Sequence, residues 1–418
     1  MNKSLYIVAF SLAFATTGIA QNNEGQDKVI DLGTQTTTEL RKTQAVSTIY
    51  SNELDKNAAT SPYNAIYGLL PGLSVMQNTS WGTDKSRLNV RGRGSLNGDT
   101  PLFVVDGFAR PLEYINLSEI ESISVLKDGA ATALWGGRGA NGVVLITTKR
   151  GIYSQKDIKV DYKFGLGFPV NQPEFADAYT YAKARNEALR YDGLQPDMDE
   201  ASFLSGGNSD LYPNVDWQKE ALRNHTTSHQ LDITFRGGGK RLRYFSVLNY
   251  KNDMGLLNSK YTDYTDRYNS QMKKYFLNLR MNLDVDITDA TKLKLSMLGM
   301  LRETKRPTTS EATLFEQIFN TPSAAFPVQT QNGFWGSNNV LKTNPIANLA
   351  DVGYYKLNQR MLQADLRLVQ DLSVLTRGLS AELAIAYDNN ATYQETAKKS
   401  FMYQTIEKGT DGEPIYTN

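Results

Sequence analysis

The sequence reads LNVRGRGSLN at residues 88–97, PLFVVDG at 101–107, IESISVLKDGAATALWGGRGANG at 120–142 and VVLITTKR at 143–150, with almost no spacer between these stretches. The β-branched and apolar runs indicate short strands, and the glycines mark the reversals between them. No plausible catalytic set accompanies the strands. We therefore expect a small, glycine-punctuated α+β domain, which together with the preceding elements spans 45–150.

Two helices are predicted in this domain. In SPYNAIYGLL at 61–70, apolar residues recur at helical spacing, Ser61 can cap the helix and Pro62 suits its first turn. A second helix is expected at 129–135, where Asp128 precedes a run of small residues.

A formal dinucleotide motif lies within the opening stretch. GRGANG at 137–142 satisfies GxGxxG, but that fingerprint needs a strand before it and a helix after it. Here a helix is expected before it and a strand at 143–149 after it. We therefore interpret GRGANG as a turn and expect no cofactor.

Metal and catalytic sites are also not expected. The only histidines, His225 and His229, are four residues apart, with no HExxH glutamate between them and no third ligand. The carboxylates of the domain fit turns and helix caps better than a glycosidase pair. These carboxylates are Asp106, Glu119, Glu121 and Asp128.

The composition excludes several protein classes. The 418 residues include 45 Lys and Arg against 44 Asp and Glu, so no global basic field indicates nucleic acid. Cysteine is absent, which excludes disulfides and thiolate sites. With 40% hydrophobic residues, the chain is not compositionally disordered.

The N-terminus resembles a secretory signal peptide at 1–20. Lys3 precedes an apolar run at 5–15, and small residues lead to a predicted cleavage between Ala20 and Gln21. The run is too short for a spanning helix, and the alternative is an uncleaved anchor. A polar, Thr-rich stretch follows at 21–44, which we interpret as a flexible tether.

Beyond Gly151 the pattern changes to long alternating strands. Apolar residues at every second position of 277–287 alternate with polar ones, and a tight turn at 288–290 leads to a second such strand. Further strands are expected at 158–167, 229–236, 242–250, 360–372 and 379–393, with long polar segments at 169–225, 251–273 and 303–355. Short turns alternating with long loops are typical of an outer-membrane barrel, whereas a soluble sandwich has shorter strands.

These motifs resemble the SusC/RagA-type family of TonB-dependent outer-membrane transporters. The resemblance rests on the stretches at 88–150 and, downstream, on FADAYTYAKARNEALRYDG at 175–193, YPNVDW at 212–217 and NPIANLADVGYY at 344–355. It implies that 45–150 is a plug domain and that 151–418 is the N-terminal part of an antiparallel transmembrane β-barrel with long extracellular loops. Such barrels have about 22 strands.

The resemblance also implies a function and partners. Members import oligosaccharides or peptides across the outer membrane of Gram-negative, Bacteroidetes-like cells, without chemistry on the substrate. Energy comes from TonB with its ExbB/ExbD complex, and a SusD-like surface lipoprotein covers the barrel. We expect these partners, together with outer-membrane lipid and no nucleic acid. Trp81, Phe334 and Trp335 could stack on sugars or serve packing, so the substrate stays open.

Two groups of residues are expected to act in this setting. A TonB box, which a partner adds to a sheet edge, is predicted in the tether at Asp27, Lys28, Val29, Ile30, Asp31, Leu32 and Gly33. Three arginines that alternate along RLNVRGR are expected to pack the plug against acidic wall residues such as Asp284 or Asp286. These arginines are Arg87, Arg91 and Arg93.

The chain departs from the family pattern in two ways. No carboxypeptidase-regulatory-like domain stands between signal peptide and TonB box, and only about seven or eight candidate strands precede Asn418. A partial barrel leaves an unpaired edge in lipid, so we expect a truncated transporter. The alternatives are a non-transporting fragment and a signal-transducing receptor, which would need a further folded domain before the TonB box.

Overall fold

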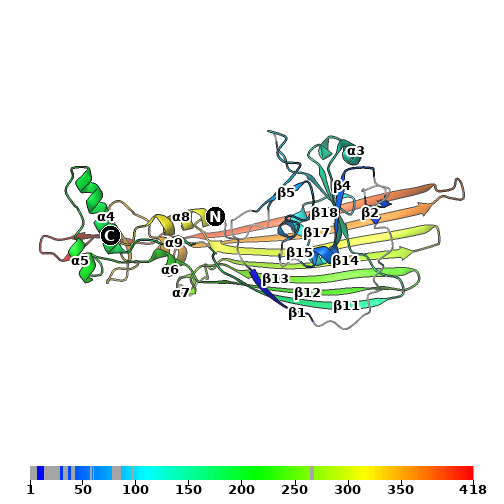
Figure 1. The fold of residues 1–418 in the computed structure, drawn as a ribbon. Helices are drawn as coiled ribbons and strands as arrows, with labels where there is room; N and C mark the ends of the chain where they lie inside the picture. The colour runs from blue at the N-terminus through cyan, green and yellow to red at the C-terminus, as the bar shows by residue number, and fades with distance from the viewer. Residues whose placement is uncertain are drawn as a thin grey trace.

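The main element of the computed structural model is a curved sheet of eight antiparallel strands (Figure 1). The structure describes residues 7–13, 29–31, 36–38, 43–56, 59, 61–77, 86–96, 98–170, 172–263 and 268–417. In spatial order the strands are β1 (Ile7–Ala13), β11 (Lys156–Gly167), β12 (Thr226–Gly238), β13 (Leu242–Met254), β14 (Lys273–Asp286), β15 (Thr291–Pro307), β17 (Gly353–Asp371) and β18 (Ser380–Lys398). We call the seven strands from β11 to β18 the wall.

The alternation of side chains divides the wall into two faces. On β14, Asn278, Arg280 and Asn282 are buried on the concave face, whereas Leu279 and Met281 are exposed on the convex face. The convex face is apolar on the neighbouring strands as well, because cross-strand register keeps like positions together. Exposed members include Ile158, Val160, Phe235, Leu248, Met297, Leu301, Leu362, Leu366 and Ile385. The predicted apolar and polar faces are thus confirmed.

Short turns and long connections alternate along the wall, as predicted. Turns at 239–241, 287–290 and 372–379 lie at one end, and segments 168–225, 255–272 and 308–352 lie at the other (Figure 1).

The long segments are more ordered than the predicted loops. They carry α4 (Ala178–Tyr191), α5 (Glu200–Ser205), α6 (Trp217–Ala221), α7 (Ser259–Thr262), α8 (Glu311–Asn320), α9 (Pro345–Ala350) and the strand β16 (Trp335–Ser337). β16 pairs with β19 (Tyr403–Lys408), which pairs with β20 (Pro414–Thr417). Buried side chains from all of these long segments, including Trp217, Tyr261 and Phe326, form one apolar core. Among the described helices, none is long and apolar enough to cross a membrane.

The domain expected to be a plug, residues 43–150 as far as they are described, lies on the concave side of the wall (Figure 1), and we refer to it as the plug. Its sheet has the order β4 (Val46–Tyr50), β9 (Ile120–Leu126), β10 (Val143–Thr148), β7 (Leu102–Val105) and β8 (Phe108–Ala109). A separate hairpin joins β5 (Leu73–Met76) to β6 (Arg87–Val90). The shorter elements are α1 (Ser51–Leu54), α2 (Pro62–Ala65), η1 (Leu112–Tyr114), η2 (Leu117–Glu119), α3 (Gly129–Thr132) and η3 (Ala133–Gly139).

Both predicted plug helices are shorter than expected. The helix expected at 61–70 ends after Ala65, because Gly68 has a positive φ of 74° that a helix cannot continue. The helix expected at 129–135 becomes a 3₁₀ segment after Thr132. Asp128 does cap it, with its carboxylate accepting the Ala131 amide at 2.8 Å.

The described sheet does not close, since β1 and β18 form its two edges. β1 comes from the apolar run predicted as a signal peptide, and it pairs with β11 from Ile7↔Gly167 to Ala13↔Asp161. The predicted cleavage position, Ala20 and Gln21, lies outside the described residues.

Candidate functional site between plug and wall

A fully buried ion pair joins the plug to the middle of the wall. Glu119 closes the turn η2 by accepting the Asn116 amide at 3.2 Å in a capping box. Its Oε2 accepts a hydrogen bond from Arg280 Nε at 2.5 Å, and its Oε1 accepts one from Asn278. The two charged side chains are 0% and 2% exposed. Burial raises the pKa of Glu119, and the neighbouring Arg280 guanidinium opposes that shift.

A second ion cluster joins the plug to the last two wall strands. Arg110, buried just after β8, donates to Asp365 of β17 at 2.6 Å and to Asp388 of β18 at 2.6 Å. Burial alone would lower the pKa of Arg110, but the two carboxylates raise it. The guanidinium fork therefore stays charged and holds two wall strands at once.

The third contact uses the turn between β7 and β8. Asp106 adopts φ 46°, and its carboxylate accepts hydrogen bonds from the amide and hydroxyl of Thr148 at 2.9 and 2.6 Å. Its carbonyl accepts a hydrogen bond from Arg367 of β17 at 2.7 Å. Nearby, Arg150 at the end of the plug lies 3.1 Å from Asp284 of β14.

Uncharged contacts complete this interface. Asn249 of β13 donates to Ser118 at 2.7 Å, and Asn282 of β14 donates to the Lys149 carbonyl at 2.7 Å. One apolar patch also crosses it, because Tyr114 packs against wall side chains on the concave face. These are Phe276, Leu298, Met300 and Met361.

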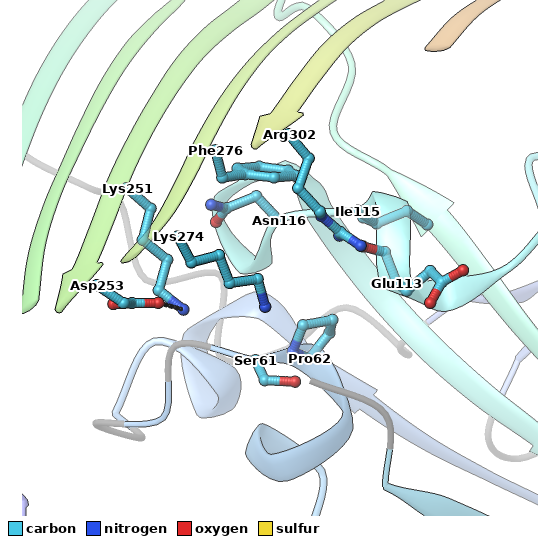
Figure 2. A pocket seen from close by; sticks show the side chains of 10 residues that line it. All are labelled: Ser61, Pro62, Glu113, Ile115, Asn116, Lys251, Asp253, Lys274, Phe276 and Arg302. Carbon is cyan, nitrogen blue, oxygen red and sulfur yellow. Dashed lines mark hydrogen bonds and ion pairs between the residues drawn. The ribbon is translucent and has the colours of Figure 1, made fainter. Parts of the chain in front are cut away.

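A small cleft lies beside this patch, between α2 and η1 of the plug and strands β13 to β15 (Figure 2). Its volume is about 30 Å³, and we call it the cationic cleft. Lys251 lies 3.0 Å from Asp253, and Arg302 donates to the Glu113 carbonyl at 2.7 Å. The cleft is lined by Ser61, Pro62, Glu113, Ile115, Asn116, Lys251, Asp253, Lys274, Phe276 and Arg302.

The three alternating arginines predicted to pack against the wall have other surroundings among the described residues. Arg87 and Arg93 both lie within 3.0 Å of Asp99, inside the plug, and Arg91 is exposed. The strand β6 ends at Val90 and Arg91 has φ 58°, so the expected alternation does not continue. Arg87 lowers the pKa of Asp99 through their hydrogen bond, with Asn89 and Arg93 contributing further. The wall is reached by Arg110 and Arg150 instead.

Part of the predicted TonB box is described. Val29–Asp31 forms β2, which pairs with β3 (Thr36–Thr38). Ile30 is completely buried in a plug cluster with Val46, Leu126 and Val143. Asp27, Lys28, Leu32 and Gly33 lie outside the described residues.

The glycine motif, the two histidines and Trp335 occupy positions in which they contribute to the fold. GRGANG at 137–142 begins in the last residues of η3, which ends at Gly139, and β10 follows it, so a helical segment precedes the motif and a strand follows it, as expected. His229 bonds to the Tyr162 hydroxyl at 2.8 Å and His225 lies against Phe168. No group of three metal-ligating side chains occurs among the residues for which positions are given. Trp335, considered for sugar stacking, is buried in the core of the long segments, and Trp81 is not described.

The residues that make the interface were largely missed by sequence reasoning. Alternation did place Arg280 and Asp284 on the polar face of β14. Arg110 has no periodic neighbour that would mark it, and Glu119 was interpreted only as a turn or cap residue. The pairing of Glu119 with Arg280 joins positions 161 residues apart, which no local pattern reveals.

Comparison with known proteins identifies the plug. Residues 38–143 match the family model described as TonB-dependent Receptor Plug Domain. The chain is 28% identical over 281 residues to TonB-dependent receptor P26 of Formosa agariphila, covering 65% of this chain and 26% of that relative. It is 29% identical over 283 residues to TonB-dependent receptor SusC of Bacteroides thetaiotaomicron, covering 64% of this chain and 26% of SusC. The chain thus spans about a quarter of the length of these relatives.

The fold is similar to that of a solved importer. The structure of the RagAB peptide importer in its open-open state aligns with a TM-score of 0.70 at 19% identity, covering 91% of this chain and 44% of that one. The closed-closed state gives a TM-score of 0.68 and covers 85% and 42%. The described part of the chain therefore shares its fold with part of this importer. The proteins named here are receptors and importers and not enzymes.

Proposed function

Because this chain carries the plug domain of TonB-dependent receptors and is related in sequence to receptors of the SusC type, we propose that it serves TonB-dependent nutrient import across the outer membrane. The single observation that carries the proposal is a folded plug on the concave side of an antiparallel wall, joined to it by buried ion pairs. A plug held in this way blocks the path along the concave side of the wall, so it must shift before a substrate can pass.

The mechanism we propose is a population shift. Ligand bound on the side of the long segments favours a plug conformation in which the β2 hairpin separates from the plug. Ile30 is buried among plug side chains, so its release exposes apolar surface and a free strand edge. TonB can pair with such a strand by adding it to its own sheet, and its pull unfolds weakly held plug elements.

The proposed partners are those that the family resemblance implies. They are TonB with the ExbB/ExbD complex, a SusD-like lipoprotein over the long segments, and outer-membrane lipid around the convex face. The apolar side chains of that face support a lipid contact. The proposed substrate is an oligosaccharide or a peptide, and we propose export through a signal peptide at 1–20 to the outer membrane of a Gram-negative, Bacteroidetes-like cell.

Deleting 27–33 from the protein expressed from its own gene tests this mechanism. We expect ligand binding to persist and uptake to be abolished, because the strand that TonB would pair with is gone while the wall and long segments remain. Uptake is measured with labelled oligosaccharides and peptides in whole cells, and binding with the purified protein. A control variant replaces Asn22, Asn23 and Gln26 with serine, which keeps the length of the tether. Normal uptake by the deletion variant contradicts the mechanism.

A further inference from the structure

The apolar surface of the convex face ends at a definite level on β15. Its convex positions from Leu293 to Leu301 are leucine, methionine or glycine, and the next two convex positions are Glu303 and Lys305. The eight steps from 293 to 301, at about 3.4 Å each, span roughly 27 Å along the strand, which is of the order of the apolar band of about 25 Å on membrane barrels. We call its end toward the long segment at 308–352 the outer boundary.

Tyrosines lie along the outer boundary on neighbouring strands. Strand register places Tyr250 of β13 in the same transverse row as Leu301. It places Tyr275 of β14 and Tyr393 of β18 in the next row outward, which is the row of Glu303. Tyrosine rings are typical of the level at which the apolar part of a bilayer meets the headgroups and water. The outer boundary therefore has the composition of a headgroup level.

Three lysines lie in one row just outside these tyrosines. Lys305 of β15 is directly opposite Lys273 of β14 on one side and Lys356 of β17 on the other. We call these three residues the lysine row, and none of them is buried. Directly opposite side chains have Cβ atoms about 4.5–5.5 Å apart, and like charges at such positions destabilise a sheet. The lysine row therefore has a cost that the sheet alone does not explain.

Carboxylates beside the lysine row offset part of its charge. Glu303 lies 3.1 Å from Lys305 and 3.2 Å from Lys356, so one carboxylate is shared by two lysines. Glu395 of β18 is directly opposite Lys356, and its carboxylate also accepts a hydrogen bond from the Tyr354 hydroxyl.

The convex face is cationic at this level on the four strands β14, β15, β17 and β18. Their convex positions in the row of Leu301 and the next two rows outward are all described, and they hold four cations and two carboxylates. The fourth cation, Arg360, is exposed in the row of Leu301, with its guanidinium 5.5 Å from the centre of the Tyr393 ring. The others are the lysine row, Glu303 and Glu395.

The chemistry of lysine indicates which ligand suits this level. Its ammonium group is a compact point charge that binds phosphate, and its long stem can lie on apolar surface while the charge stays in water. Basic side chains beside a bilayer attract anionic lipid headgroups. A phosphate between neighbouring lysines is attracted by both of them, so it offsets their mutual repulsion.

We propose that the lysine row binds the phosphate of anionic lipid headgroups in the leaflet nearer the long segments. The inference goes beyond nutrient import and rests on the proposed lipid contact of the convex face. The acyl chains of the lipid lie along the apolar band beside Leu301. The phosphate lies at Lys305, within reach of Lys273 and Lys356.

Binding of two matched lipids to the purified protein in neutral detergent tests the proposal. Dioleoylphosphatidate and dioleoylphosphatidylcholine have the same acyl chains, but only the first has a net negative headgroup. We expect phosphatidate to bind about tenfold more tightly in a native mass spectrometry titration, and this preference to weaken as the salt concentration rises. Inorganic phosphate alone should not displace phosphatidate, because it has no acyl chains to lie against the wall.

Variants assign the preference to the lysine row. Lys305→Gln should lower the affinity for phosphatidate about fivefold and leave that for phosphatidylcholine within about twofold, whereas Lys305→Arg should keep both. The variant should also keep its thermal transition, because it removes repulsion between like charges. Lys183→Gln is the matched control, since Lys183 is exposed on α4, far from the wall (Figure 1). Lys356→Gln is a second variant if Lys305→Gln does not fold.

Equal affinity for the two lipids overturns the proposal. A preference that both Lys305→Gln and Lys356→Gln leave unchanged also overturns it, as does displacement of phosphatidate by inorganic phosphate, which would identify a site for free phosphate. None of these outcomes contradicts the lipid contact itself, which a substitution at Leu279 tests separately. Uptake is likewise tested separately, by deleting 27–33.

Discussion

Glu119 of the plug and Arg280 of the wall form an ion pair from which solvent is excluded on both sides, with 2.5 Å between Oε2 and Nε. Such a pair contributes uncertain net stability, but removing one partner leaves an uncompensated buried charge. The pair therefore acts as a fixed point that holds the plug on the wall. Its removal should destabilise the seated plug more than removal of any exposed ion pair.

Glu119→Ala is expected to destabilise the seated plug by about 3 to 5 kcal/mol, because Arg280 and Asn278 lose their acceptor. The measurement is the rate of plug proteolysis and the thermal transition of the purified protein. Glu121→Ala is the matched control. Its side chain is 43% exposed and lies 3.6 Å from Arg236, so the cost should be no more than about 1 kcal/mol. Equal effects of the two variants would contradict the fixed-point interpretation.

Acid should loosen the edge strand β4 through Asp128. The carboxylate accepts the Ala45 amide at 2.9 Å and the Ala131 amide at 2.8 Å, and these bonds lower its pKa. A group with a depressed folded pKa stabilises the protein above its unfolded pKa of about 3.9, and this contribution is lost as pH falls through the lower folded value. Hydrogen exchange of the β4 amides should therefore accelerate below about pH 4.

Asp128→Asn separates charge from capping. Asparagine caps a helix about as well as aspartate, so the variant should stay folded at pH 7. At acid pH, hydrogen exchange of the β4 amides should accelerate less in this variant than in the wild-type protein. An identical acid response in both proteins would assign the effect to other carboxylates.

Gly107→Ala should destabilise the turn between β7 and β8. Gly107 has φ 90°, which costs an L-residue roughly 1–2 kcal/mol, and an added Cβ would lie 2.8 Å from Arg367 Nη2. That arginine bonds to the Asp106 carbonyl, so its displacement also weakens the contact with β17. The control is Gly299→Ala, where a Cβ meets nothing within 4 Å. Thermal transitions of both variants provide the comparison.

Leu279→Arg tests the proposed lipid contact of the convex face. Arginine near the middle of a bilayer costs about 2–4 kcal/mol on the lipid side of a barrel. We expect a smaller folded fraction in lipid vesicles, measured by gel mobility without heating. Leu375→Arg is the control, since Leu375 is 74% exposed in the short turn between β17 and β18. A folded fraction as large as that of the control would place the convex face in water.

Local pattern predicted a large part of the fold and little of the site. The alternation at 277–287 placed β14 correctly and assigned its two faces, because side chains of a strand alternate whatever the strand packs against. Asp128 was found as a helix cap for the same reason, since capping depends on neighbours within one turn. The prediction of a helix over the whole of 61–70 was wrong, because the chain turns at Gly68 although the apolar spacing continues.

Long-range partners were beyond such reasoning. Arg87, Arg91 and Arg93 had the spacing of one strand face, yet Arg87 and Arg93 pair with Asp99 within the plug. Arg110, with no pattern around it, holds Asp365 and Asp388, more than 250 residues away. The order within the long segments was also missed, because their core draws single side chains from several distant stretches.

The sequence by itself determined a compact α+β unit followed by long alternating strands, since strand period, glycine turns and caps are local properties. Only the tertiary structure decided which charges meet across the plug and wall, because burial pairs residues by position in space and not by distance along the chain. For residues 88–150, this means that Arg110 and Glu119 hold the plug against the wall, whereas Arg93 pairs with Asp99 inside the plug.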